Sequence, residues 1–357
     1  GKVFLLKYFF PIKFLVGKNK VFVNIFSLQK FKALLVEEVA GKQFQASVTE
    51  RDLAELPKGD VLIRVQYSSL NYKDALSASG NKAVTRSYPH TPGIDAAGKV
   101  VMSTSPDFAE GDAVIVTGYD LGMNTSGGFG QLIRVPGNWV INCPEAMSLK
   151  QAMILGTAGF TAALCVEKLL VNGLTPASGS VLVTGATGGV GSVAVALLHK
   201  LGFTVVASTG KRSSHPFLEQ LGAAQIIDRN SLAEVNSRPL LKPQWAGAID
   251  VVGGDTLFNV IKSINYGGSV ACCGLVQSPA LQGTVLPFIL RGVNLLGVDS
   301  VELSAQTKAD IWNKLAREWK LENLDTIYKE IDFSELEASL GKVLKGEAVG
   351  RYLLNLN

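Results

Sequence analysis

The stretch Val181-Leu-Val-Thr-Gly-Ala-Thr-Gly-Gly-Val-Gly-Ser192 decides the fold. Its first three residues are apolar and run into a glycine-rich turn. The turn leads into Val193–Leu198, an apolar segment that predicts a buried helix, and a second apolar run, Thr204–Ala207, follows. The order strand, glycine turn, helix, strand is typical of a βαβ unit whose helix N-terminus receives a pyrophosphate. The stretch therefore predicts a dinucleotide site and, with it, redox chemistry.

The glycines of this turn follow the spacing G-x-x-G-x-x-G rather than the G-x-G-x-x-G of the common NAD fingerprint. We expect Gly185 to allow the sharp turn off the strand, and Gly188 and Gly189 to let phosphate oxygens approach backbone N–H groups. Gly191 would let the helix pack closely against the strand. The alternative is an ordinary turn that binds nothing, which the flanking strand and helix disfavour.

The end of the following strand bears on which dinucleotide is bound. NAD-binding folds place an Asp or Glu there, about 20 residues beyond the glycines, to hold the ribose 2′-OH. This chain has Ala207-Ser-Thr-Gly-Lys-Arg212 and no acid. Thr209 supplies a hydroxyl, and Lys211 and Arg212 supply cations that suit a 2′-phosphate. The loop therefore favours NADPH over NADH, with a solvated basic loop as the alternative.

The composition fits an α/β enzyme of two domains. The chain has 357 residues, of which 47% are hydrophobic and 18% charged, and it contains 37 glycines. A net charge of +4 is too small to indicate nucleic-acid binding. The four cysteines lack C-x-x-C spacing, so they predict neither a disulfide framework nor a zinc site and favour a reducing, cytoplasmic setting.

Residues 1–31 differ from the remainder of the chain. Residues 1–30 hold six lysines and no Asp or Glu, and lysines and Pro11 interrupt their apolar runs. None of these runs reaches the roughly 18 residues that a membrane span needs. We expect the extension to contribute little to the fold, as a translated upstream region, an expression artefact or a misassigned start would. A targeting segment is the alternative.

The remaining sequence divides into a β-rich module, a doubly wound module and a returning tail. Residues 32–150 carry short strand candidates between turns, residues 151–301 alternate strands with helices, and residues 302–357 should form a helix and return to the β-rich module. We predict strands over 32–36, 61–67, 98–101, 113–116, 204–207, 225–227, 248–252, 268–272 and 294–298, and we expect the tail segments 331–333 and 350–354 to return to the β-rich module. We predict helices over 148–170, broken near 156–159, over 305–324 and over 335–345.

Five motifs follow one another along the chain: Ser68–Leu76 (SSLNYKDAL), Pro92–Asp95 (PGID), Gly156–Thr161 (GTAGFT), Trp245–Asp250 (WAGAID) and Pro287–Arg291 (PFILR). Together they resemble the acrylyl-CoA reductase and quinone oxidoreductase branch of the zinc-independent medium-chain dehydrogenase/reductase superfamily. The resemblance spans about residues 32–357. It implies a GroES-like β-rich barrel joined to a Rossmann domain, a homodimer, and NADPH-dependent reduction of a small enoyl-CoA, acrylyl-CoA to propionyl-CoA above all.

The resemblance also bears on zinc. Zinc-dependent members of the superfamily carry a Cys where this chain has Asn71, and their Gly-His-Glu motif is Gly93-Ile-Asp95 here. Their third ligand is a Cys in the segment that here reads 156–159, and residues 117–131 contain none of the four cysteines of their structural zinc site. We expect no metal site, with Asp95 as a structural carboxylate.

The expected chemistry places two residues at its centre. Without a metal to polarise it, a thioester carbonyl needs hydrogen-bond donors as its enolate forms, and Cα needs a proton. We expect Tyr72 to contact the cofactor and to orient or protonate the substrate, and Asn71 to donate to the enolate. A packed aromatic ring is the alternative for Tyr72. Lys73 and Asp74 are expected to form a solvated helix start.

The resemblance implies further contacts with NADPH. They are Thr187, Gly188, Gly189 and Val190 in the phosphate turn, Thr209, Gly210 and Lys211 in the 2′-phosphate loop, Arg229 near the adenosine phosphate, Leu275 at the nicotinamide, and Ile289, Ser300 and Arg351. Lys211 replaces an arginine of the branch, which bears on the strength of NADPH selection. A tail arginine such as Arg351 usually faces solvent.

Several alternatives remain open at this point. Quinone reduction is a second enzymatic reading, and an NADPH-binding protein without catalysis is a third, which Asn71 and Tyr72 disfavour. Arg86, Lys82 and Arg291 are candidates for the phosphates of CoA, with surface solvation as the alternative. The three histidines show no partner spacing, and we assign them no catalytic role.

Overall fold

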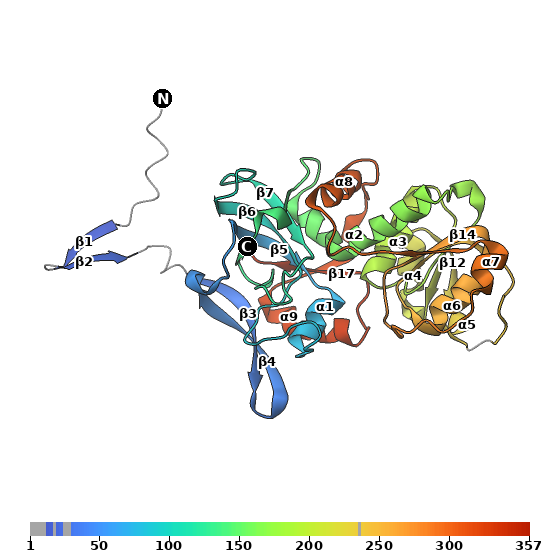
Figure 1. Cartoon of the computed structure of the whole chain (residues 1–357), viewed down its shortest axis with the longest axis horizontal. Coiled ribbons are helices and arrows are strands. Elements are labelled where there is room, and N and C mark those ends of the chain that lie inside the picture. The colour runs from blue at the N-terminus through green and yellow to red at the C-terminus, as the bar shows by residue number, and fades with distance from the viewer. Residues whose placement is uncertain (1–11, 17–18, 24–29, 235–236) are drawn as a thin grey trace.

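The computed structural model describes residues 12–16, 19–23, 30–234 and 237–357 (Figure 1). Most of the extension predicted at residues 1–31 therefore lies outside the described residues. Within it, β1 (Ile12–Val16) and β2 (Asn19–Val23) form an antiparallel two-stranded sheet. Neither strand pairs with another described strand.

A seven-stranded sheet forms the β-rich module. Its strands run in the order β16-β17-β5-β6-β7-β9, and β8 pairs with β5. They are β5 (Val61–Ser69), β6 (Asp95–Ser103), β7 (Ala113–Thr117), β8 (Leu132–Val135), β9 (Val140–Asn142), β16 (Tyr328–Ile331) and β17 (Arg351–Asn355). Because β17 pairs antiparallel with β5, the tail returns to this module as the sequence predicts.

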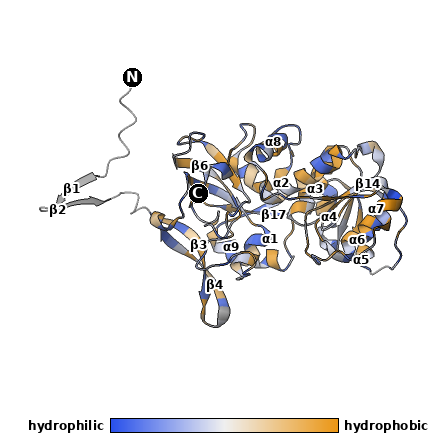
Figure 2. Ribbon diagram, in the orientation of Figure 1, coloured by the Kyte–Doolittle hydropathy of each residue, from blue (hydrophilic) through white to orange (hydrophobic). Residues whose placement is uncertain are grey.

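A long hairpin stands beside this sheet. It consists of β3 (Lys30–Val39) and β4 (Gln43–Asp52), which are antiparallel. The sequence predicts the first strand, but the second was not predicted. Polar and apolar residues alternate along β4 (Figure 2), and that alternation is the period of a half-exposed strand.

The doubly wound module is an all-parallel six-stranded sheet in the order β12-β11-β10-β13-β14-β15. Its strands are β10 (Val181–Val183), β11 (Val205–Thr209), β12 (Ala223–Asp228), β13 (Trp245–Asp250), β14 (Ile264–Cys272) and β15 (Asn294–Gly297). The order reverses between β10 and β13. Ligands of such sheets bind where the order reverses, at the carboxyl ends of the strands, and here the glycine turn follows β10.

Nine helices are present among the described residues: α1 (Tyr72–Ala78), α2 (Leu149–Val171), α3 (Gly189–Lys200), α4 (His215–Gln220), α5 (Asn230–Ala233), α6 (Gly254–Lys262), α7 (Leu286–Arg291), α8 (Ala305–Ala316) and α9 (Phe333–Leu344). α2 breaks at Gly156, whose φ is 53° and ψ −160°, as predicted. The predicted end of α8 at residue 324 is wrong. Arg317 leaves helical geometry, and the chain turns so that Trp319 can be buried.

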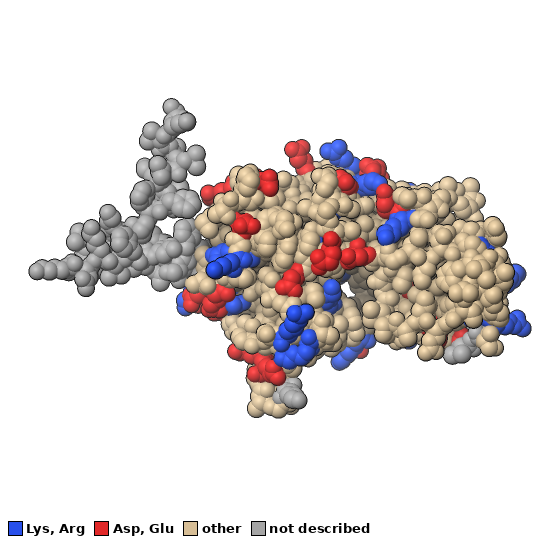
Figure 3. All heavy atoms as spheres, in the orientation of Figure 1, with Lys and Arg blue, Asp and Glu red and all other residues tan. Residues whose placement is uncertain are grey.

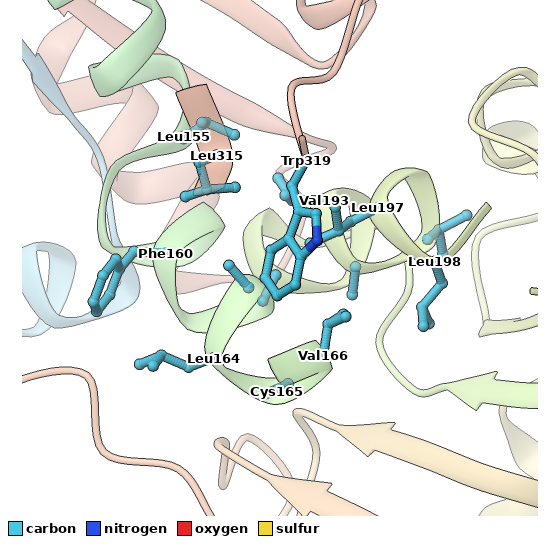
Figure 4. Close-up of a cluster of buried hydrophobic side chains, with 14 of the residues drawn as sticks. Leu155, Phe160, Leu164, Cys165, Val166, Val193, Leu197, Leu198, Leu315 and Trp319 are labelled. Carbon is cyan, nitrogen blue, oxygen red and sulfur yellow. The ribbon is translucent and has the colours of Figure 1, made fainter. Parts of the chain in front are cut away.

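The largest core lies between the two sheets, where α2 packs against α3. Figure 4 shows the side chains that meet there, with Trp319 at the centre and Leu155, Phe160, Leu164, Val193, Leu197 and Leu315 around it. α2 is long and apolar enough to cross a membrane, but 72% of its most apolar window is buried inside the fold. Its length and apolarity are therefore explained by its place in the core.

Candidate active site

The glycine turn after β10 leaves space in front of α3. Gly185 has φ 57°, and a Cβ on Gly191 would lie 2.3 Å from the Gly185 carbonyl oxygen, so these two glycines make the turn and the close helix packing that the sequence predicts. A Cβ on Gly188 would meet nothing closer than 3.4 Å. The first N–H groups of α3, beginning at Gly189, lack acceptors within the helix. This cradle fits a pyrophosphate.

The loop after β11 brings two cations together. The Thr209 Oγ1 accepts a hydrogen bond from the Lys211 N–H at 3.0 Å, and the Arg229 N–H donates to the Thr209 carbonyl at 3.1 Å. A Cβ on Gly210 would lie 2.6 Å from Arg229 Nε. Burial lowers the pKa of Lys211, and the charge of Arg229 lowers it further. Two neighbouring cations make this loop a fitting site for a 2′-phosphate, whereas Arg212 is exposed beside it.

The carboxyl ends of β14 and β15 border an open cavity of about 570 Å³. Its lining includes Leu275, Cys273 and Val298 from the sheet edge and Leu164 from α2. Leu275, a predicted nicotinamide contact, is 61% exposed at this cavity. Ile289 is exposed on α7 and is not among the lining residues of the cavity.

Tyr72 is the first residue of α1 and Asn71 is its N-cap. Tyr72 is 42% exposed, so the residue is open to a ligand. Asn71 Nδ2 donates to Asp95 Oδ2 at 2.8 Å and lies 3.3 Å from Asp74 Oδ2. Both hydrogens of this amide therefore have acceptors within the protein. The predicted donation from Asn71 to an enolate stays a prediction.

The carboxylate of Asp95 is the centre of a buried polar network. It is fully buried and accepts hydrogen bonds from Ser69 Oγ at 2.6 Å, from Asn71, and from both the N–H and the hydroxyl of Thr157. A Cβ on Gly156 would lie 2.1 Å from Ser69 Oγ and 2.6 Å from Asp95 Oδ2. The helix break at Gly156 thus makes room for the network, in which Asp95 has a structural role.

The expectation of a solvated helix start is wrong for Asp74. Its side chain is fully buried on α1, which packs against α9. One carboxylate oxygen accepts from the Ile94 N–H and the other from the Asn71 N–H, both at 2.8 Å. Burial, together with the charge of Asp95, raises the pKa of Asp74 to about 7. The sequence showed only an acid in a first turn, which is usually exposed.

The expectation that a tail arginine faces solvent is also wrong. Arg351 is 3% exposed, and its guanidinium donates to the carbonyls of Ile154 and Leu70, each at 3.1 Å, and to Asn71 Oδ1 at 3.3 Å. Burial lowers the pKa of Arg351, and the nearby carboxylates oppose that shift. A Cβ on Gly189 would lie 2.7 Å from Arg351 Nη1. One guanidinium therefore lies between the loop of Tyr72 and the phosphate turn.

The other candidate residues have separate surroundings. Ser300 Oγ lies 2.9 Å from Thr161 Oγ1 on α2. Lys82 pairs with Glu38 at 2.7 Å, and Arg291 donates to two backbone carbonyls. Among the described residues, no group of three or more His, Cys, Asp or Glu side chains is arranged to hold a metal ion.

Sequence reasoning missed three members of the network. Ser69, Gly156 and Thr157 were not predicted as site residues, although all three lie in the motifs SSLNYKDAL and GTAGFT. The signal available was the co-occurrence of these motifs with the buried acid of PGID. No feature of the sequence indicates that these three motifs contact one another in the fold.

Surface charge is consistent with a small-molecule site. Figure 3 shows Lys and Arg interleaved with Asp and Glu over the half of the molecule that holds the seven-stranded sheet. On this face, the described residues form no continuous basic surface.

Two family models match the chain. Residues 57–145 match the alcohol dehydrogenase GroES-like domain, and residues 189–317 match the zinc-binding dehydrogenase domain. The first spans most of the seven-stranded sheet, and the second begins at α3. The start of the glycine turn and most of the returning tail lie outside both matched ranges.

Curated relatives and solved structures align with this chain over nearly its whole length and nearly the whole of theirs. "Putative quinone oxidoreductase YhfP" of Bacillus subtilis is 46% identical over 91% of this chain and 99% of its own length, and acrylyl-CoA reductase AcuI of Ruegeria pomeroyi is 43% identical over 92% and 99%. The YhdH oxidoreductase of Salmonella enterica, crystallised with NADP, superposes with a TM-score of 0.89 at 45% identity, over 91% of this chain and all of that chain. The chain belongs to the medium-chain dehydrogenase/reductase superfamily, in the branch that contains these acrylyl-CoA reductases and quinone oxidoreductases.

Proposed function

We propose that the protein is an NADPH-dependent oxidoreductase that reduces a small α,β-unsaturated acyl thioester, with acrylyl-CoA as substrate and propionyl-CoA as product. The observation that carries this proposal is the position of Arg351 between Asn71 and the phosphate turn. A dinucleotide with its pyrophosphate at α3 would lead toward Tyr72. An activated alkene beside Tyr72 would then have hydride on one side and a hydroxyl within reach.

The cofactor, when bound, supplies the hydride that goes to Cβ of the substrate. The chain's own groups do the remaining work. The hydroxyl of Tyr72, an exposed residue, orients the thioester and gives a proton to Cα. Asn71, fixed by Asp95 and Arg351, holds the start of α1 and thereby the direction of Tyr72. Lys211 and Arg229 bind the 2′-phosphate.

The names of the relatives support both acrylyl-CoA reduction and quinone reduction. AcuI is named as an acrylyl-CoA reductase, and YhfP as a quinone oxidoreductase. YhdH was crystallised with NADP, whereas YhfP was crystallised with NAD. Quinone reduction is therefore the second candidate. Neighbouring cations at Lys211 and Arg229 favour NADPH over NADH in this chain.

One assay separates the candidates. Oxidation of NADPH and of NADH is followed at matched concentrations with acrylyl-CoA and with 1,4-benzoquinone. The proposal expects turnover with NADPH and acrylyl-CoA to exceed every other pair. Faster turnover of benzoquinone would favour the quinone reductase. Tight NADPH binding without turnover of either acceptor would leave a cofactor-binding protein without catalysis.

We also propose that the protein is a homodimer in the cytoplasm. β15 is the last strand of its sheet, and the residues that precede it include exposed apolar side chains, among them Val276, Val285, Ile289 and Leu290. A two-fold axis beside β15 would continue the sheet and bury them. Light scattering after size-exclusion chromatography should give twice the chain mass, and the chain mass alone would refute the dimer.

A further inference from the structure

Lys308 on α8 is a buried lysine that none of the predicted contacts includes. Its side chain is 0% exposed, and Nζ donates to the Thr117 carbonyl at 2.6 Å and to the Val301 carbonyl at 2.9 Å. The same nitrogen lies 3.4 Å from the centroid of the Tyr119 ring. A buried ammonium is retained only where its donors are satisfied. Here two carbonyls and one aromatic face satisfy them.

Tyr119 also contacts the segment of residues 301–303, which precedes α8. It is the one non-glycine residue with a positive φ among the described residues, at 51°, a conformation that side chains rarely adopt without reason. Its ring stacks on Trp139 at 5.5 Å, and its hydroxyl donates to the Leu303 carbonyl at 2.7 Å. Residues 301–303 are thus clamped onto the end of β7 by Lys308 and Tyr119.

The clamped segment begins beside Ser300, a predicted cofactor contact. Ser300 Oγ meets Thr161 Oγ1, which donates to the Thr157 carbonyl at 2.7 Å. Thr157 in turn donates to Asp95, and Asp95 stands opposite Thr117 in the pairing of β6 and β7. The contacts therefore form a continuous ring of interactions. Thr157 and Thr161 on α2 link Asp95 to Ser300, and Lys308 links the adjacent Val301 to Thr117, which pairs with Asp95.

We infer that Lys308 is a positioning residue for the nicotinamide half of the cofactor. By tying Val301 to β7, it fixes Ser300 at the carboxyl edge of the sheet, on the side of the Asp95 network. The inference rests on the proposed function, because it requires that NADPH binds. It leaves the adenosine half to Lys211 and Arg229, which follow β11 and β12.

The charge state of Lys308 gives the inference a pH dependence. The charged groups that act on it are Asp95 from β6 and Asp299 and Glu302 from the neighbouring segment. Burial lowers the pKa of Lys308 to about 8, and these carboxylates oppose part of that shift. As the pH rises through about 8, the amine loses one donor and its attraction to the Tyr119 ring. NADPH binding should weaken accordingly.

The test compares NADPH with 2′,5′-ADP, which carries the adenosine half alone. Lys308→Met should raise the Kd of NADPH about tenfold, the loss expected from one to two hydrogen bonds, and should leave the Kd of 2′,5′-ADP unchanged. Lys314→Met is the matched control. Lys314 lies on the same helix and pairs with Glu167 at 2.8 Å, away from the clamp, and this variant should bind both probes as the wild-type protein does.

A general loss of structure would weaken both probes together, so equal losses for NADPH and 2′,5′-ADP would overturn the inference. An unchanged Kd for NADPH in Lys308→Met would overturn it as well. If wild-type protein bound neither probe, the proposed function would fail and the inference with it. Wild-type binding of both probes therefore separates the two failures.

If Lys308→Met does not fold, a second variant tests whether Lys308 supports NADPH binding. Lys308→Arg stays charged at every accessible pH. The ratio of the Kd of NADPH to the Kd of 2′,5′-ADP should rise from about pH 7 to about pH 9.5 in the wild-type protein and rise less in Lys308→Arg, in which only the titration of Lys308 is removed. Titration of Lys211 affects both probes and cancels in the ratio. The same pH dependence in both proteins, or none in the wild type, would contradict the role of Lys308.

Discussion

The phosphate turn and the Asp95 network lie on either side of Arg351, yet they are built in opposite ways. The turn is one continuous stretch, Gly185–Gly191, and works through backbone N–H groups and the absence of side chains. The network is assembled from four separate segments and works through buried side chains. A site made of backbone groups is disturbed when side-chain atoms are added at its glycines. A site made of buried side chains is disturbed when one hydrogen-bond partner is removed. The two regions should therefore fail differently when they are altered.

The largest effect is expected where a partner is removed from the network. Arg351→Met leaves the carbonyls of Ile154 and Leu70 and the Oδ1 of Asn71 buried without their donor. At about 1–3 kcal/mol for each unsatisfied group, the loss should total about 3–5 kcal/mol. The free energy of unfolding, measured in urea, should fall by that amount. Arg351→Lys should recover part of it. A loss below about 1 kcal/mol, the value of an exposed pair, would contradict the view that this side is held by buried charge.

Tyr72→Phe tests the network side without disturbing its packing. Tyr72 is 42% exposed and phenylalanine keeps its ring, so the free energy of unfolding and the Kd of NADPH should stay as they are. Turnover of the preferred acceptor should fall about 10²-fold, the lower range for a lost general acid. Unchanged kcat would exclude the hydroxyl from proton transfer.

Lys211→Ala tests the cofactor side. Removing this cation should weaken NADPH about tenfold, as expected for a lost charge-assisted hydrogen bond, and leave NADH unchanged. The ratio of the two Kd values is the measurement. Arg212→Ala is the neighbouring comparison, because the sequence also offers this exposed cation to the 2′-phosphate, and it should cause the smaller loss. Equal losses for both cofactors would show that Lys211 does not read the 2′-phosphate.

The most gradual effect is a pH dependence that arises in the network and is spread over about three pH units. Burial and Asp95 raise the pKa of Asp74 to about 7, so the folded protein keeps a proton that the unfolded chain releases near pH 4. Stability should then fall as the pH rises from about 4 to about 7, by less than about 1.4 kcal/mol per pH unit. Asp74→Asn should flatten this slope, and an unchanged slope would assign the proton elsewhere.

The same contrast explains what the sequence could predict. The turn, the parallel sheet and the loop of Thr209 and Lys211 depend on neighbours along the chain, so periodicity and glycine spacing were enough. Asp74 and Arg351 depend on contacts between distant segments, and their local sequence is that of exposed residues. The hairpin strand β4 was missed for a different reason. It is only partly buried on either face, and it carries no apolar run to mark it.

The pairing of β17 with β5 also sets an order of events during synthesis. Residues 67–69, which lead into Asn71, pair with Leu353–Asn355, and Arg351 reaches Leu70 across 281 residues. On the ribosome, domains fold largely in the order in which they emerge. The loop of Tyr72 emerges early but must wait for β17, so this part of the nascent chain keeps an open strand edge while the Rossmann sheet is being made. The loop that carries Tyr72 is thus among the first segments to be translated and among the last to become ordered.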